Sequence, residues 1–252
     1  MKRNLPNAVT CLNLLCGCLA LTQIFSSDPH GLVYGAYFVG LAAVADFFDG
    51  LLARALRVSS AIGKDLDSLA DMVSFGVVPG AILFHLLQTA LFGAQANKAF
   101  LGAAPGGLHY LPYVAFLVTI FSALRLAKFN NDTRQTTSFI GLPTPACTLV
   151  VASLPLILAH ELAGHPDAPT WLSSLILNPL VLLGVTVLLS GLLVAELPLF
   201  ALKFKTLRWA DNRRRFLFVL LAAGLLLALR AAAVPLVVLL YVLLSVPKMA
   251  ER

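Results

Sequence analysis

The sequence predicts an all-α, polytopic membrane protein, and its composition, its long apolar stretches and the placement of its basic residues all indicate this class. Of 252 residues, 59% are hydrophobic and only 12% are charged, whereas soluble domains carry about 25% charged residues. The mean hydropathy is +0.89. This composition argues against a disordered chain, a secreted disulfide scaffold and a nucleic-acid-binding protein, although the net charge is +6.

Eight apolar stretches are long enough, or nearly long enough, to cross about 30 Å of hydrocarbon as helices. The last two come from one apolar run that Arg230 divides into two short pieces. A tight terminal hairpin is the preferred interpretation of this run, and one long tilted helix is the alternative. The expected spans are 8–26, 32–52, 66–91, 108–128, 142–160, 174–200, 214–229 and 232–246.

The basic residues predict the orientation of these spans. With the N-terminus inside, the inner segments hold 16 of the 18 lysines and arginines, and only Lys98 and Arg230 fall in outer loops. Cytoplasmic loops of membrane proteins accumulate lysine and arginine in this way. We therefore expect eight spans with both termini on the cytoplasmic side.

A single integral membrane domain over 1–252 is expected, because no repeat and no long polar insert divides the chain. Its expected parts are a helical core over 1–200, a basic segment over 201–213 and a terminal helical hairpin over 214–252. The basic segment interleaves aromatic and aliphatic residues with lysine and arginine, which is typical of an interface with anionic lipid head groups. A simple positive-inside anchor is an equally good interpretation.

Acidic residues cluster at the inner ends of the second and third expected spans. The members of each pair are three or four positions apart, so each pair lies on one helical face. Four repelling carboxylates require a counter-charge, and hard divalent cations prefer such oxygen ligands. We predict a site for Mg²⁺ or Mn²⁺ with two ions, an arrangement suited to phosphoryl chemistry; ordinary loop charges are the alternative. The pairs are Asp46 with Asp49 and Asp67 with Asp71, while Asp65 is expected to point away.

Small residues accompany the acids. Gly50 follows Asp49 directly and Gly63 opens the third span, which leaves room for a ligand to approach the backbone. Ala53 and Arg54 lie about one helical turn beyond Gly50, where a small side chain and a cation could flank a diphosphate. A small-residue helix contact with an inner-edge anchor is the alternative.

The segment 46–71 carries a complete family signature. It reads Asp-Phe-Phe-Asp-Gly-Leu-Leu-Ala-Arg, then eight residues, then Gly-Lys-Asp-Leu-Asp-Ser-Leu-Ala-Asp. This pattern resembles the CDP-alcohol phosphatidyltransferase signature at every fixed position and spacing. The resemblance implies a six-helix catalytic core over 1–200, usually dimeric, with the terminal hairpin as an extension. It also implies cleavage of a CDP-linked lipid at the phosphoanhydride and transfer of the phosphatidyl group to an alcohol.

The resemblance also assigns roles to individual residues. Asp71 corresponds to the proposed general base of the family. The metal-site acids correspond to Asp46, Asp49, Asp67 and Asp71, and the CDP-binding positions to Asp46, Asp49, Gly50, Ala53, Arg54, Gly63 and Asp67.

The acceptor alcohol is indicated by sequence around the signature. Segments 5–14, 67–80, 122–130, 139–146 and 202–205 together resemble the bacterial membrane-bound phosphatidylserine synthases. This implies L-serine and CDP-diacylglycerol as substrates, membrane lipid and a second copy of the chain as partners, and a site facing the cytoplasm from the bacterial inner membrane. The alternatives are glycerol 3-phosphate or inositol as acceptor, or a cation-coupled transporter, in which buried acids mark an ion pathway.

A serine pocket needs a cation, because a carboxylate moved to a dry site requires a paired charge. Arg125, at the inner end of the fourth span, is the preferred residue. Lys128 and Arg134 are alternatives for the carboxylate or for lipid phosphate, and positive-inside anchoring would explain all three. Polar residues in apolar surroundings could line the same cavity or hydrogen-bond between helices; they are Asn7, Asn13 and Ser74.

Overall fold

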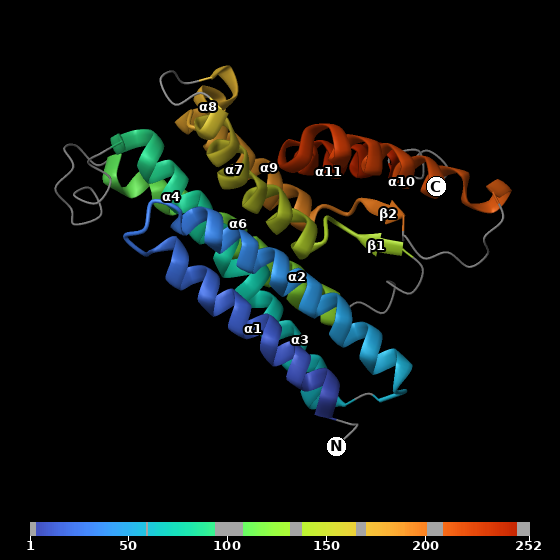
Figure 1. Cartoon of the computed structure of the whole chain (residues 1–252). Coiled ribbons are helices and arrows are strands. Elements are labelled where there is room, and N and C mark those ends of the chain that lie inside the picture. The colour runs from blue at the N-terminus through green and yellow to red at the C-terminus, as the bar shows by residue number, and fades with distance from the viewer. Residues whose placement is uncertain are drawn as a thin grey trace.

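The computed structural model describes residues 4–58, 60–93, 108–131, 138–164, 170–200 and 209–245. In these ranges the chain forms a bundle of long helices with one short two-stranded ribbon (Figure 1). The expected all-α class is confirmed. Apart from residues 209–213, which open α10 (Trp209–Leu229), the expected basic segment lies outside the described residues.

The first two helices, α1 (Leu5–Ile24) and α2 (Gly31–Ala55), lie side by side along most of their length (Figure 1). Pro6 stands in the first turn of α1, where its fixed φ suits a helix start and its missing N–H costs nothing. Close packing depends on small residues, because a Cβ on Gly35 would lie 2.7 Å from Cγ1 of Ile24. This pairing sets the second half of α2 opposite the first half of α1.

The third expected span is a single stretch of three helical segments, α3 (Ala61–Asp71), the π-helix η2 (Met72–Val77) and α4 (Val78–Phe92). Ser60 caps α3 by accepting a 3.0 Å hydrogen bond from the Gly63 N–H. π-Helical turns are rare and occur often at functional sites. Here the turn begins directly after Asp71.

Side chains of neighbouring helices bind backbone carbonyls of η2. The Thr148 hydroxyl donates to the Phe75 carbonyl at 2.9 Å, and the Thr119 hydroxyl donates to the Gly76 carbonyl at the same distance. Because a buried carbonyl needs a partner, these threonines stabilise the π-helical geometry.

The core of the bundle lies around α4, whose side chains are buried on all faces. Ile82, Leu83, Leu86 and Leu87 each expose 1% or less of their surface. A helix that is apolar all round belongs inside a bundle, and residues from most of the other long helices complete this cluster.

The second half of the bundle continues with helices joined by short connections. The ribbon pairs Phe139 of β1 with Leu199 of β2 in antiparallel register. Next to it, Gly141 has a φ of +77° and stands against the backbone of α9, so a side chain here would be strained. The elements are η4 (Leu108–Phe116), α6 (Leu117–Asn131), β1 (Ser138–Ile140), α7 (Thr144–Gly164), α8 (Trp171–Ile176), α9 (Pro179–Val194) and β2 (Pro198–Phe200).

The chain turns back on itself between α10 and α11 (Ala233–Ser245), through the 3₁₀ turn η5 (Arg230–Ala232). The rings of Phe218 and Tyr241 are 5.6 Å apart, whereas a straight helix would separate these positions by about 35 Å. Arg230 has a positive φ of 50° at the turn. The structure therefore contains two helices folded against each other rather than one straight helix, while the boundaries of the three expected parts remain a prediction.

The chain is an integral membrane protein. In the part that the structure describes, six helical stretches are long and apolar enough to cross a membrane. Helix α9, with 16 residues, is shorter than these stretches. The residues of α10 and α11 from Arg215 to Ser245 are counted as one of the six. The expectation of eight spans therefore remains a prediction. The six stretches are Leu5–Ile24, Gly31–Ala55, Ala61–Phe92, Leu108–Asn131, Thr144–Gly164 and Arg215–Ser245.

Candidate active site

Three of the predicted acids meet where α2 faces α3. Asp46 and Asp49 project from the last third of α2, and Asp67 projects from α3. One carboxylate oxygen from each lies within 4.8 Å of the other two. Asp49 is buried, with 6% of its surface exposed. Three carboxylates this close repel one another strongly in a partly buried site, and a divalent cation fits such an all-oxygen donor set.

Asp71 lies one helical turn beyond Asp67 and is not part of the group within 4.8 Å. It is close enough to Asp46, Asp49 and Asp67 for the four charges to interact. The side chain of Asn13 in α1 donates a 3.1 Å hydrogen bond from Nδ2 to Oδ1 of Asp71. The four acids are thus gathered in one region, with Asp71 on the side of η2.

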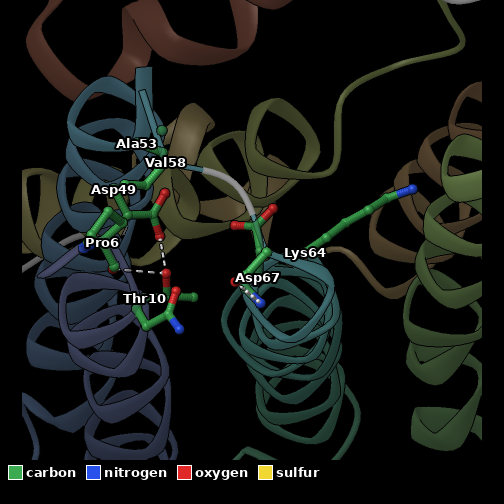
Figure 2. A pocket seen from close by; sticks show the side chains of 11 residues that line it. Pro6, Thr10, Asp49, Ala53, Val58, Lys64 and Asp67 are labelled. Atoms are coloured by element: carbon green, nitrogen blue, oxygen red, sulfur yellow. Dashed lines mark hydrogen bonds between the residues drawn. The ribbon is translucent and has the colours of Figure 1, made fainter. Parts of the chain in front are cut away.

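Helix α1 contributes to the site in a way that the sequence interpretation missed. The Thr10 hydroxyl donates to Oδ2 of Asp49 at 2.7 Å and also lies 3.1 Å from the Pro6 carbonyl oxygen (Figure 2). Asn7, Thr10 and Asn13 are spaced by three in an apolar part of the helix, so they share one face. That spacing is the signal that would have identified Thr10.

A partly open cavity of about 240 Å³ adjoins the acids and is bordered by the ends of α1, α2 and α3. Figure 2 shows Asp49 and Asp67 facing each other across it. A Cβ on Gly50 would meet no atom within 4 Å, so the space beside this backbone is open. The volume approaches the lower end of the range of about 300–1,000 Å³ that is usual for small-molecule sites. Its lining comprises Pro6, Asn7, Thr10, Asp49, Gly50, Ala53, Val58, Ser60, Gly63, Lys64 and Asp67.

Most of the predicted CDP-binding residues therefore line one cavity. Asp49, Gly50, Ala53, Gly63 and Asp67 belong to its lining, and Asp46 is in the adjoining acid group.

Arg54 is placed differently from the other predicted CDP-binding residues. It is exposed, does not belong to the cavity lining, and donates from Nε to the carbonyl of Gly50 at 2.9 Å. The sequence interpretation did not single out Pro6, Thr10, Val58 and Ser60 as lining residues, and it assigned no role to Lys64.

Lys64 connects the cavity to α6. Its side chain is directed away from Asp49 (Figure 2), and its Nζ donates to the backbone carbonyl of Asn130 at 3.2 Å. The Asn130 amide in turn donates to Oγ of Ser68 at 2.8 Å. These two bonds hold the start of α3 against the end of α6.

Of the predicted acceptor-pocket cations, Arg125 is the one buried near the acids. It exposes 8% of its surface, lies close enough to Asp71 for their charges to interact, and donates a long 3.4 Å hydrogen bond to Oγ1 of Thr144. Its guanidinium also lies 5.8 Å from the ring centroid of Phe129. Lys128 is exposed, and Arg134 lies outside the described residues.

Comparisons with known proteins identify the family of the chain and several relatives. A family model for CDP-alcohol phosphatidyltransferase matches residues 3–192. The chain is 32% identical over 169 residues to a CDP-diacylglycerol–serine O-phosphatidyltransferase of Bacillus subtilis, covering 64% of this chain and 82% of the relative. It is 31% identical over 224 residues to the Helicobacter pylori protein of the same name, covering 87% and 80%. A Saccharomyces cerevisiae protein of that name is 32% identical over 171 residues, covering 61% and 55%.

Proposed function

The chain belongs to the CDP-alcohol phosphatidyltransferase family, and from this premise we propose that it transfers the phosphatidyl group of CDP-diacylglycerol to the hydroxyl of L-serine, giving phosphatidylserine and CMP. The observation that carries the proposal is the group of three carboxylates from α2 and α3 beside a cavity with an open glycine backbone. Serine as acceptor is supported by the relatives that carry this enzyme name.

The acids would hold divalent cations. Asp46, Asp49 and Asp67 offer only carboxylate oxygens, which suit Mg²⁺ or Mn²⁺, and Asp71 is close enough to contribute to a second position. We propose two ions per site. When bound, such ions neutralise the charge of the diphosphate and of the leaving phosphate.

Asp71 is proposed as the general base. The serine hydroxyl gives its proton to the Asp71 carboxylate while its oxygen attacks the lipid-side phosphorus. The phosphoanhydride bond breaks, and CMP leaves with the bonding electrons. Asn13 donates to Oδ1 of Asp71 with its amide, which orients this carboxylate. Thr10 holds Asp49 in the same way.

The nucleotide is proposed to bind in the cavity between α1, α2 and α3. Small residues leave the backbone accessible to the diphosphate, and Arg54, which bonds the Gly50 carbonyl through Nε, has terminal N–H groups that can face a phosphate. The proposed CDP-binding set is Asp46, Asp49, Gly50, Ala53, Arg54, Gly63 and Asp67.

For the acceptor, Arg125 is the proposed carboxylate-binding cation, because it is the buried cation nearest the base in the described part of the chain. Lys128 and Arg134 remain proposals for lipid phosphate.

The membrane arrangement is also a proposal. We place eight spans in the bacterial inner membrane, with both termini and the site on the cytoplasmic side. Two observations support this placement: α1 begins, α2 ends and α3 begins around the cavity, and Arg54, Arg57 and Lys64 stand at the same end, as expected of a cytoplasmic face. A homodimer is proposed from the family resemblance, and the mass of the particle in detergent tests it.

The decisive experiment follows CMP release by purified protein in detergent. CDP-diacylglycerol and Mn²⁺ are supplied with L-serine, glycerol 3-phosphate, inositol or no acceptor. We expect release that depends on serine and stops with EDTA. Asp49→Asn should abolish it, whereas Asp65→Asn should not, because Asp65 is exposed on the same acidic stretch. CMP release with glycerol 3-phosphate or inositol but not with serine would show that serine is not the acceptor. No CMP release with any acceptor would overturn the proposal.

A further inference from the structure

Several buried polar atoms without hydrogen-bond partners lie on the helices that pack against η2, the turn that follows Asp71. Among the described residues, three of the six such side-chain atoms belong to α1 and α6, the helices that pack against η2. Buried polar groups are normally paired, so each unpaired one needs an explanation, for example a bound ligand. The three atoms are Oδ1 of Asn13, Oγ of Ser122 and Nε of Arg125.

Asn13 presents a free acceptor next to the proposed base. Its side chain is fully buried, and its Nδ2 donates to Oδ1 of Asp71. As the proposed base, Asp71 must be ionised before it takes a proton, and an ionised carboxylate only accepts, so in that state the amide nitrogen of Asn13 faces Asp71. Oδ1 of Asn13 is therefore a buried acceptor without a donor, and it belongs to the same amide group that contacts Asp71.

Arg125, whose charge also interacts with Asp71, has a donor without a partner. It exposes 8% of its surface, its Nε has no partner among the described residues, and its Nη1 donates a long hydrogen bond of 3.4 Å to the Thr144 hydroxyl. A guanidinium carries five N–H donors in a planar fork that suits a carboxylate. Ser122, one turn earlier on α6, lies against Gly76 of η2 and carries a buried hydroxyl without a partner.

We propose that Asn13 and Arg125 are the two ends of an amino-acid subsite. Oδ1 of Asn13 accepts a hydrogen bond from the α-ammonium of the acceptor, and the Arg125 guanidinium binds its α-carboxylate. The hydroxyl of a small amino acid held in this way lies at Asp71. The proposal rests on the proposed transferase function and deepens it by explaining the choice of acceptor. An alcohol that lacks the ammonium or the carboxylate would leave Asn13 or Arg125 unpaired in a buried site, and would therefore be rejected.

The test compares three acceptors in the CMP-release assay: L-serine, L-serinamide, which lacks the carboxylate, and 3-hydroxypropionate, which lacks the ammonium. In Arg125→Gln, kcat/KM for serine should fall about 100-fold while that for serinamide stays within about 3-fold. In Asn13→Leu all acceptors should lose rate, because Asp71 loses its donor, and the loss should be about 10-fold larger for serine than for 3-hydroxypropionate.

Matched controls separate a lost subsite from a damaged fold. Ser190→Ala removes another buried hydroxyl without a partner, on α9, and should leave all three rates unchanged. Calorimetric affinity for CDP with Mn²⁺ reports an intact nucleotide site. If Arg125→Gln does not fold, Arg125→Lys keeps the charge and should show a raised KM for serine with kcat preserved.

The two proposals fail separately. If the folded Arg125 and Asn13 variants keep the wild-type ratios of kcat/KM between the three acceptors, the subsite is wrong. The proposed function would then still be supported by the serine-dependent CMP release of the wild type. A wild type that releases no CMP with serine would overturn the proposed function itself.

Discussion

The hydroxyl of Thr10 in α1 donates a 2.7 Å hydrogen bond to Oδ2 of Asp49 in α2, and both side chains are buried. The two residues are 39 positions apart, so helix packing alone brings them together. A donor behind a metal-binding carboxylate fixes its orientation and tunes its affinity. The first helix, which carries none of the signature acids, therefore takes part in building the acid group.

Replacing Thr10 with valine keeps the shape of the side chain and removes this donor. We expect the Mn²⁺ concentration for half-maximal activity to rise about 10-fold, as is usual when such a partner is lost. A Mn²⁺ titration of CMP release measures it. The control is Thr22→Val, which removes an exposed hydroxyl bonded only to the Leu19 carbonyl of the same helix; equal metal dependence in both variants would contradict a role for Thr10.

Asp71→Asn preserves the size of the proposed base but cannot take a proton from the acceptor. CMP release should fall by about 10³-fold or more, in line with the contribution of a positioned general base, while most of the affinity for CDP with Mn²⁺ is retained. Initial rates and calorimetry provide the two measurements, with Asp65→Asn as the exposed control on α3. Full turnover in the Asp71 variant would show that another group accepts the proton.

Because the carboxylates of the acid group repel one another, removing one of them should stabilise the metal-free protein while it abolishes activity. Asp67→Asn removes one of three carboxylates that lie within 4.8 Å, so the melting temperature in EDTA should rise by about 2–4 °C. The stabilisation by added Mn²⁺ should shrink, because binding to the folded state is its source, and activity should be lost. Thermal unfolding of wild type, Asp67→Asn and Asp65→Asn with and without Mn²⁺ measures this. A lower melting temperature of the metal-free Asp67 variant would mean that the carboxylate stabilises the fold.

Two glycines should respond in opposite ways to alanine. A Cβ on Gly50 meets nothing within 4 Å, so Gly50→Ala should gain about 0.5–1 kcal/mol from helix propensity yet raise the KM for CDP-diacylglycerol about 10-fold by filling the cavity. A Cβ on Gly17 would overlap Oγ of Ser74, so Gly17→Ala should lose about 1–3 kcal/mol. Melting curves and KM values separate the two effects. Loss of stability in Gly50→Ala with an unchanged KM would place the nucleotide elsewhere.

Local spacing made part of the site predictable from the sequence. Asp46 and Asp49 share one face of α2, and Asp67 and Asp71 share one face of α3, because residues three or four apart lie together on any helix. Gly50 and Gly63 were also predictable as places where a ligand can approach the backbone, because a glycine carries no side chain in any fold. The sequence could not show that Asp71 lies outside the group of three carboxylates within 4.8 Å, or that Arg54 bonds the Gly50 carbonyl outside the cavity lining.

By itself, the sequence determined the membrane class, the helical content and the paired acids, because hydropathy and helical periodicity act over neighbouring residues. Only the tertiary structure decided which groups meet across helices: Thr10 with Asp49, Asn13 with Asp71, and Arg125 beside that acid. The same holds for the π-helix after Asp71, whose carbonyls are bound by threonines of distant helices, and for the folding back of α11 on α10. The physical reason is that such contacts depend on packing between segments far apart in the chain, and no local pattern encodes them.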